Sequence, residues 1–356
     1  MMKDTSLLGV AAVIAICLGL LIAAPTSAQT VTVTSSGGAV QEAQRTAWYG
    51  TFTKTTGIKI VEDNWNQELA KVRAQVETKS LKWDVVEITA LNLSAACEEG
   101  LVERIDWSRY FDPKDFEDAG GLPPCGVPIL NASGGLAYDA DKVKDPPKTW
   151  ADFWNVKKWP GKRGMLYRAE QTLEVALMAD GVAPKDVMSV LSAPGGVDRA
   201  FRKLDELKPH IHWWKIGSES MQLLATGETV LSYAWNGRVA AANKADKRNF
   251  KMVFEAGFVN GNNSFAVMKG SPNRDAAIKF IQFAASPKPL AEFAEIIQYG
   301  PPNRRALEFM DARAKATIPS GAIMRHAMFQ HGDKYVSFWS DNAAKLTERF
   351  GQWVAK

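Results

Sequence analysis

A strand, a glycine turn, a helix and a second strand follow one another soon after residue 28, and this order constrains the fold most. Residues 31–34 alternate as in a strand, and the turn Ser-Ser-Gly-Gly follows at residues 35–38. Apolar residues then recur at helical spacing through residues 40–52, Gly57 ends the helix, and residues 58–61 begin another strand. This is the βαβ unit from which parallel sheets are built.

The same alternation continues along the chain and predicts the class α/β. Thr149 is a suitable N-cap for the helix that follows it. After residue 275 the pattern is mostly helical, with breaks at Pro287, at Pro301 and near Pro319. Between the first unit and residue 275, the patterns predict helices at 66–79, 91–99, 149–154, 171–180, 197–208 and 218–226, and strands at 83–88, 134–138, 164–167, 229–233, 251–255 and 264–268.

Residues 1–28 read as a secretory signal peptide. Lys3 precedes an apolar run at residues 7–24, and the small residues Thr-Ser-Ala at 26–28 predict cleavage after Ala28. A retained membrane anchor is the alternative, because the run has just the length that spans a bilayer. We expect an exported, periplasmic protein, and the surroundings of Cys17 lack the small residues of a lipidation site.

Cys97 and Cys125 are the two cysteines that remain after the predicted signal peptide. In an exported protein such a pair predicts a disulfide, with a metal site or a nucleophile as alternatives. Closing this loop would stabilise the fold by roughly 3–4 kcal/mol on the chain-entropy model.

Composition indicates a globular protein of ordinary charge. The formal net charge is +4, and the basic residues are scattered along the sequence. We therefore expect no nucleic-acid partner, since such partners favour blocks of Lys and Arg. The length after cleavage suffices for two domains, and we expect a monomer.

Ligands of α/β sheets lie beyond the carboxyl ends of the strands, where helix amino termini offer free N–H groups. Several polar segments follow predicted strand ends and are therefore candidates for a binding site. These are residues 35–38, 89–92, 168–174, 235–237 and 261–264.

Most of the chain after the signal peptide resembles the extracellular solute-binding proteins of ABC importers, in particular the spermidine/putrescine-binding group. The resemblance is carried by segments in a fixed order: 52–60 (FTKTTGIKI), 83–86 (WDVV), 99–106 (EGLVERID), 148–154 (KTWADFW), 235–237 (WNG) and 299–303 (YGPPN).

The resemblance implies a two-lobed periplasmic-binding-protein fold of type II, in which each lobe is a mainly parallel sheet flanked by helices. Crossing strands near Ala137 and Ala266 would form the hinge. Lobe 1 would hold residues 29–137 and 266–316, and lobe 2 residues 138–265 and 317–356. One solute would bind between the lobes and pass to a membrane permease, and no cofactor is implied.

Family site residues carry over unevenly. Trp235 matches an aromatic that packs on polyamine methylenes, Glu174 an acid that binds an ammonium group, and Gln330 a late polar contact. Two departures stand out. Asn263 occupies the place of the amine-binding aspartate, and the residues 35–38 replace an aromatic pair.

These departures favour a solute that carries an acid as well as an amine. A polyamine needs several carboxylates, because a buried ammonium loses its hydration. The turn at Ser36, Gly37 and Gly38 could bind an anion through its N–H groups, and Arg168 could clamp a carboxylate. With Glu174 for the amine, the sequence predicts a zwitterionic amino-acid derivative such as an opine. A true polyamine is the alternative.

Thr89, Asn92 and Asn236 complete the candidate site, each at a predicted strand end. Each candidate also has a plain structural explanation. A tryptophan can be half-buried, an arginine can make a surface ion pair, and a glycine can serve only the turn.

Other functions are less compatible with the sequence. It lacks the serine elbow, the P-loop and the dinucleotide fingerprint, so we expect no enzyme, with a periplasmic hydrolase as the alternative. A ferric-ion binder would need clustered hard oxygen donors, and no two tyrosines are adjacent. His210 and His212 lie on one face of a possible strand but lack a third ligand, so no metal is expected.

Overall fold

The computed structural model describes residues 29–356. The predicted signal peptide, its anchor alternative and Cys17 lie outside this range. Within it, no helix has the length and apolar character needed to cross a membrane.

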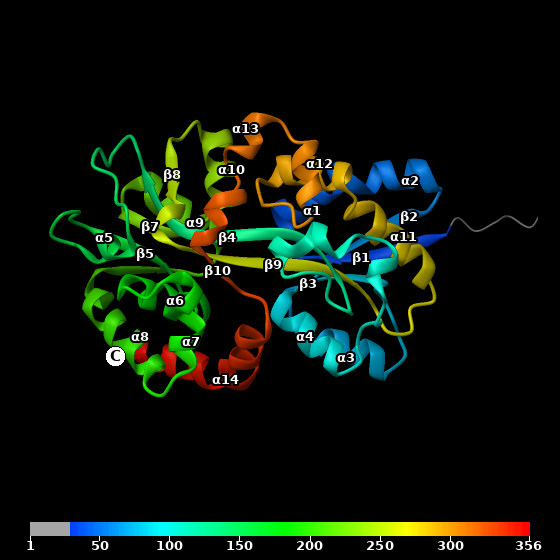
Figure 1. Cartoon of the computed structure of the whole chain (residues 1–356), viewed down its shortest axis with the longest axis horizontal. Coiled ribbons are helices and arrows are strands. Elements are labelled where there is room, and N and C mark those ends of the chain that lie inside the picture. Colours follow the sequence, from blue (N-terminus) through cyan, green and yellow to red (C-terminus); the bar gives the residue numbers. More distant parts are fainter. Residues whose placement is uncertain (1–28) are drawn as a thin grey trace, which may run out of the picture.

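A single mixed sheet runs through the molecule, with helices above and below it in Figure 1. The strand order is β2-β1-β3-β9-β4-β7-β5-β6, while β10 pairs with β9 and β8 with β4. The strands are β1 Thr30–Ser35, β2 Lys59–Asn64, β3 Val85–Thr89, β4 Val127–Asp139, β5 Lys162–Leu166, β6 Ile211–Trp214, β7 Thr229–Trp235, β8 Phe250–Val253, β9 Phe258–Val267 and β10 Ala327–Phe329.

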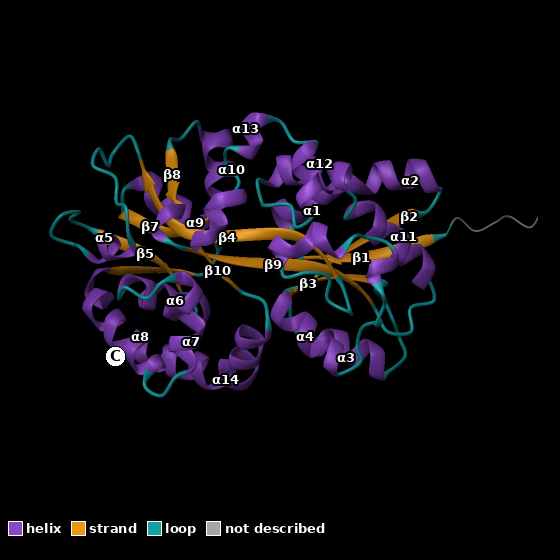
Figure 2. Ribbon diagram, in the orientation of Figure 1, coloured by secondary structure: helices purple, strands orange, loops and turns teal. Residues whose placement is uncertain are grey.

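Fourteen α-helices flank this sheet (Figure 2). They are α1 Gly38–Gln44, α2 Gly50–Thr56, α3 Leu69–Glu77, α4 Ala90–Glu98, α5 Trp150–Trp154, α6 Ala169–Ala179, α7 Val187–Ser192, α8 Gly196–Leu207, α9 Gly217–Thr226, α10 Asn236–Asp246, α11 Arg274–Ala284, α12 Pro287–Ile297, α13 Ala312–Lys315 and α14 Asp333–Ala355 among the described residues. A π-helical turn, Arg45–Tyr49, joins α1 to α2.

Two parallel blocks are bridged by the antiparallel strands β4 and β9. In lobe 1, β1 pairs in parallel with β2 and β3, and in lobe 2, β5 pairs in parallel with β6 and β7. Strand β9 is antiparallel to β3 and β4, and β4 is antiparallel to β7. The fold class predicted from the sequence, two mainly parallel lobes joined by crossing strands, is confirmed.

Separate hydrophobic cores stabilise the two lobes. On β4, Val127 packs in the lobe 1 core around Trp48, whereas Leu136 packs in the lobe 2 core around Leu173. On β9 the change runs the other way, from Val259 in lobe 2 to Phe265 in lobe 1. The expected crossing points, Ala137 and Ala266, lie within these strands.

Local sequence signals account for several element ends. Gly57 ends α2 with φ 75°, a left-handed conformation that glycine adopts without steric cost. Thr149 caps α5 and forms a capping box with Asp152. The disulfide predicted between Cys97 and Cys125 is present, with a Cα–Cα distance of 5.8 Å, and ties α4 to the segment before β4.

Some predicted elements were wrong in extent. Strand β4 begins seven residues earlier than the predicted start at Gly134, and β9 begins at Phe258 rather than Ser264. The unrecognised parts contain Pro128, beside a register shift, and the run 260–263 of Asn and Gly, residues that strands disfavour. Elements α7, α10 and β10 were not predicted at all.

Candidate ligand-binding cleft

A cavity of about 390 Å³ lies between the lobes, over the middle of β4 and β9. Residues at the carboxyl ends of β3, β5 and β7 line it, as the strand-end rule predicts. Its volume falls in the range of ordinary small-molecule sites, about 300–1,000 Å³. Six predicted site residues line this cleft: Thr89, Asn92, Arg168, Trp235, Asn263 and Gln330.

The lobe 2 wall is built from the irregular start of α6. Arg168 is the extended N-cap, and Glu170 and Gln171 have non-helical backbone angles, so the regular helix begins at Thr172. Gln171 has φ 72°, a left-handed conformation that costs energy for a residue with a Cβ. The result is that Arg168 and Glu170 both face the cleft.

A chain of hydrogen bonds holds this wall together. Tyr233 Oη donates to Gln171 Oε1 at 2.8 Å, and Gln171 Nε2 donates to Gln330 Oε1 at 3.1 Å. Gln330 Nε2 donates to Tyr335 Oη at 2.7 Å, and Tyr335 Oη donates to Glu170 Oε1. The Gln171 side chain thus joins Tyr233 on β7 to Gln330, the residue that follows β10.

Arg168 and Glu170 form a loose pair, since Arg168 Nη1 lies 3.9 Å from Glu170 Oε2. The Arg168 side chain is 50% exposed, whereas that of Glu170 is 24% exposed. This exposure leaves the guanidinium free to bond a ligand.

Amide and hydroxyl groups make up the lobe 1 wall. Gln67 Nε2 donates to the Glu87 carbonyl at 3.0 Å, and the Thr89 N–H donates to Gln67 Oε1 at 3.2 Å. Thr89 caps α4 by accepting from the Asn92 N–H, and Asn92 Nδ2 donates to the Gln67 carbonyl at 2.9 Å. Behind them, Asn263 Nδ2 donates to the buried carboxylate of Glu87 at 2.6 Å.

Trp235 gives the cleft an apolar side. Its ring meets Trp214 edge-on, with centroids 5.3 Å apart and planes at 81°. A Cβ on Gly217 would come within 2.8 Å of the Trp235 ring, so the glycine makes room for this ring. Leu91, Ala132 and Val259 line the same cavity.

Five predicted residues do not line the cleft, and we correct their assignment. Ser36 Oγ instead donates to Glu87 at 2.8 Å, and Gly37 and Gly38 shape the turn with positive φ. Asn236 is buried and bridges the Ser133 N–H to the Gln298 carbonyl. The five predicted residues that do not line the cleft are Ser36, Gly37, Gly38, Glu174 and Asn236.

Glu174 lies wholly inside lobe 2. Trp339 Nε1 donates to its Oε1 at 2.8 Å, and among residues 29–356 nothing bonds its Oε2. Burial, and next the nearby charge of Glu170, raises the pKa of Glu174 to about 8. The carboxylate in the cleft is therefore Glu170, four residues earlier.

Sequence reasoning also missed Asn66, Gln67 and Tyr335, which line the cleft, and it covered Gln171 only within the candidate segment 168–174. Asn66 and Gln67 follow the carboxyl end of β2, so the strand-end rule could have found them. Nothing local in the sequence marks Tyr335, which reaches the cleft from the start of α14.

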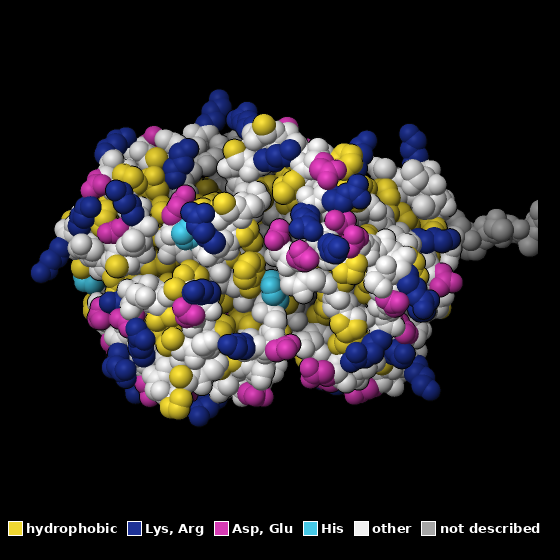
Figure 3. All heavy atoms as spheres, in the orientation of Figure 1, with side chains coloured by type: hydrophobic (Ala, Val, Ile, Leu, Met, Phe, Trp, Pro, Cys, Tyr) yellow, Lys and Arg dark blue, Asp and Glu magenta, His cyan; other side chains and the backbone are white. Residues whose placement is uncertain are grey.

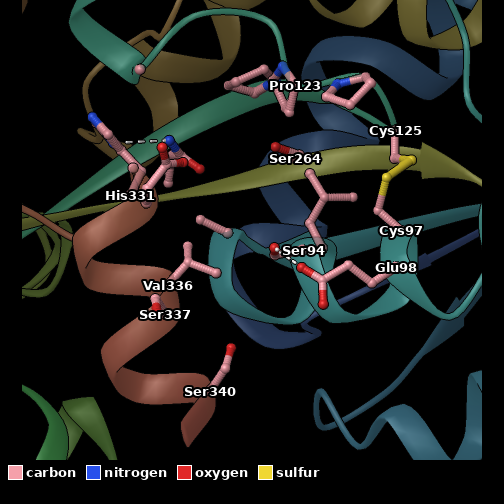
Figure 4. Close-up of a pocket in the computed structure, with 18 of the residues that line it drawn as sticks. Ser94, Cys97, Glu98, Pro123, Cys125, Ser264, His331, Val336, Ser337 and Ser340 are labelled. Carbon is pink, nitrogen blue, oxygen red and sulfur yellow. Dashed lines mark hydrogen bonds between the residues drawn. A yellow bond between two sulfur atoms is a disulfide. The ribbon is translucent and has the colours of Figure 1, made fainter.

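A second cavity, of about 580 Å³, lies between α4 and α14 (Figure 4). Ser264 lines it and alternates along β9 with Asn263, so the two side chains point to opposite faces of the sheet. His331 borders this cavity, its Nδ1 3.4 Å from Asn262 Nδ2, and burial lowers its pKa to about 4. This second cavity is larger than the first, but the sides of helices flank it. The polar residues at the strand ends line the smaller cavity, and we therefore take that one as the candidate cleft.

Charges on the molecular surface are mixed. Lys and Arg side chains lie among Asp and Glu over both lobes on the face in Figure 3, with a hollow between the lobes. His210 and His212 lie around the start of β6. Within residues 29–356 no cluster of three or more metal-binding side chains occurs.

Known proteins share this architecture. Residues 47–318 match the family of bacterial extracellular solute-binding proteins. A gamma-aminobutyric acid-binding protein of Pseudomonas aeruginosa is 41% identical over 340 residues, which cover 95% of each chain.

Two solved structures extend the comparison. A GABA receptor superposes with a TM-score of 0.80 at 31% identity, covering 92% of this chain and 98% of that one. A PBP from A. tumefaciens B6 in complex with glucopine superposes with a TM-score of 0.78 at 29% identity, covering 92% and 100%.

Proposed function

Because this chain belongs to the bacterial extracellular solute-binding proteins, we propose that it is the receptor of an ABC importer for a solute bearing both an ammonium and a carboxylate group. The solute binds in the cleft lined by Arg168, Glu170 and Trp235. It is released unchanged to a membrane permease.

The charge inventory of the cleft carries this proposal. Among the described residues that line it, Arg168 and Glu170 are the only charged side chains, one of each sign. A zwitterion matches this pair, because each of its charged groups finds an opposite charge when the cleft excludes water. A polyamine would leave Arg168 facing like charge and at least one ammonium without a carboxylate.

Each wall has a role in binding. Arg168 suits a carboxylate because its guanidinium presents paired N–H donors, and such charge-assisted bonds are about twice as strong as neutral ones. Glu170 accepts from the ammonium, and Tyr335 holds its carboxylate in place. Trp235 packs on the methylenes between the two charged groups.

The relatives support two solute classes. The P. aeruginosa relative is named for gamma-aminobutyric acid, a short ω-amino acid, and the A. tumefaciens structure holds glucopine. Both classes agree with a zwitterion-binding cleft. We propose an ω-amino acid or an opine-like conjugate as the solute.

The remaining assignments follow from the family. We propose that residues 1–28 direct export and are cleaved, and that the protein acts in the periplasm as a monomer. We also propose the division into lobes given by the resemblance, with both crossings moved to earlier residues, so that Leu136 belongs to lobe 2 and Asn263 and Phe265 belong to lobe 1.

A calorimetric panel tests the function. The exported protein is titrated with 4-aminobutyrate, glucopine, glutamate and putrescine. We expect binding of at least one zwitterion and no measurable binding of putrescine. Tighter binding of putrescine than of every zwitterion would refute the proposal.

Paired variants of α6 test the roles within the cleft. Glu170→Gln removes a charge-assisted bond worth about 1.5–3 kcal/mol, so affinity for the zwitterion should fall about 10- to 150-fold. Glu174→Gln makes the same chemical change outside the cleft and should leave affinity within about threefold. Equal losses in both variants would contradict the assignment of Glu170.

A further inference from the structure

Glu87, on β3 directly behind the lobe 1 wall, is a carboxylate with no solvent exposure. It accepts hydrogen bonds from Ser35 Oγ at 2.7 Å, Ser36 Oγ at 2.8 Å and Gln44 Nε2 at 2.9 Å. The Ser36 N–H at 3.2 Å and Asn263 Nδ2 at 2.6 Å also donate to it. Every one of these partners is a neutral donor.

These partners meet both oxygens of the Glu87 carboxylate. A carboxylate accepts hydrogen bonds at each oxygen, and all five contacts are donors to it. No ion pair within residues 29–356 includes Glu87, so no cation contacts its carboxylate directly. In a low-dielectric surrounding the charge acts over several ångströms, and the nearest cleft side chain is its hydrogen-bond partner Asn263.

The same contact fixes the orientation of the Asn263 amide. Because ionised Glu87 offers no proton, the nitrogen of Asn263 must face it, and the carbonyl oxygen Oδ1 is the atom left for the cleft. Gln44, the other amide that contacts the Glu87 carboxylate, has no oxygen left to offer a ligand, since its Oε1 accepts from Tyr49 Oη at 2.8 Å. Lobe 1 therefore presents an acceptor oxygen with a negative charge behind it.

We propose that Glu87 is a specificity-determining positioning residue, which makes Asn263 an acceptor for the ammonium group of the solute. The inference rests on the proposed function and extends it to lobe 1. Glu170 binds the ammonium from lobe 2, and Asn263 binds it from lobe 1. The three N–H donors of the ammonium therefore join the two lobes and favour closure of the cleft. A solute with a hydroxyl in place of the ammonium gains far less from the buried charge.

Two matched probes and a charge swap test the proposal. The probes are 4-aminobutyrate and 4-hydroxybutyrate, and calorimetry on the exported protein gives the ratio of their dissociation constants. In Glu87→Gln the preference for the amine should fall at least tenfold, while affinity for 4-hydroxybutyrate changes less than threefold. Adding Asn263→Asp to that variant returns the charge to the wall and should restore the preference.

Asp84→Asn is the matched control. Asp84 is also a buried carboxylate next to β3, and it accepts from Ser271 Oγ at 2.6 Å and from the Thr32 N–H at 2.8 Å, away from the cleft. This variant should leave the amine preference unchanged. An unchanged preference in Glu87→Gln, or equal loss of both probes, would overturn the role of Glu87 and leave the proposed function standing.

A second measurement needs neither a variant nor a solute. Carbon-13 labelling of the glutamate carboxyls reports by NMR whether Glu87 is ionised at pH 7. An ionised Glu87 is the expected result, and a protonated one would overturn the inference. Failure of the wild-type protein to bind any amine-bearing acid would instead refute the proposed function.

Discussion

The buried Glu174 makes the stability of lobe 2 depend on pH. Burial inside lobe 2, and next the nearby charge of Glu170, raises its pKa to about 8, from 4.5 in an exposed chain. Between these values the native state keeps a proton that the unfolded state has lost. The unfolded state binds fewer protons there, so the free energy of unfolding falls as pH rises from about 4.5 to 8.

The size of this effect follows from the two pKa values. Linkage of a single group with these values predicts a loss of about 3.5 kcal/mol between pH 5 and pH 8. His331 acts in the opposite sense, because burial lowers its pKa from 6.5 to about 4. Its contribution is a gain of about 2 kcal/mol over the same range, since the native state keeps its imidazole neutral.

The variant Glu174→Gln separates the two contributions. Glutamine keeps the oxygen that accepts from Trp339 and cannot titrate, so only the His331 effect and other shared terms remain. Urea unfolding at pH 5 and pH 8 gives the change in unfolding free energy for each protein. We expect the wild type to lose about 3.5 kcal/mol relative to the variant over this range. A relative change below about 1 kcal/mol would show that Glu174 titrates near its ordinary pKa.

Three further changes test the cleft and the disulfide. Arg168→Gln should weaken binding of a carboxylate-bearing solute about 10- to 100-fold by calorimetry. Arg199→Gln, outside the cleft, should leave the affinity within threefold of the wild type. Similar losses in the two variants would contradict the role of Arg168. Trp235→Ala should weaken binding by about 1–3 kcal/mol through lost apolar burial and Trp235→Phe by less, and unchanged affinity in the alanine variant would remove the ring from the site. Replacing Cys97 and Cys125 together by serine should lower the urea-unfolding free energy by roughly 3–4 kcal/mol, and no change would show that the bond does not constrain the unfolded chain.

Elements with strong local signals were predictable from the sequence. The strand at residues 31–34, the helix end at Gly57 and the cap at Thr149 each depend on nearby residues, and all three appear in the structure. The disulfide was predictable from the export signal and the count of cysteines. Such features need no knowledge of distant contacts.

The crossing strands were only half predicted, and their composition explains why. The middle of β4 and β9 forms the cleft floor, and its Asn and Gly residues have low strand propensity. Gly261 shows the constraint, because a Cβ there would come within 2.5 Å of Gln330 Oε1. Low strand propensity at these positions is thus a local conflict of the kind expected at binding sites.

From the sequence, the carboxylate of the cleft could be assigned only to the segment 168–174 and not to one residue. On a regular helix, residues four apart share a face, so Glu170 and Glu174 would be equivalent candidates. The left-handed backbone of Gln171 breaks that register, turning Glu170 to the cleft while Glu174 stays in the core beside Trp339. Because the contacts that hold this arrangement come from Tyr233, Gln330 and Tyr335, far along the chain, no local pattern could have separated the two glutamates.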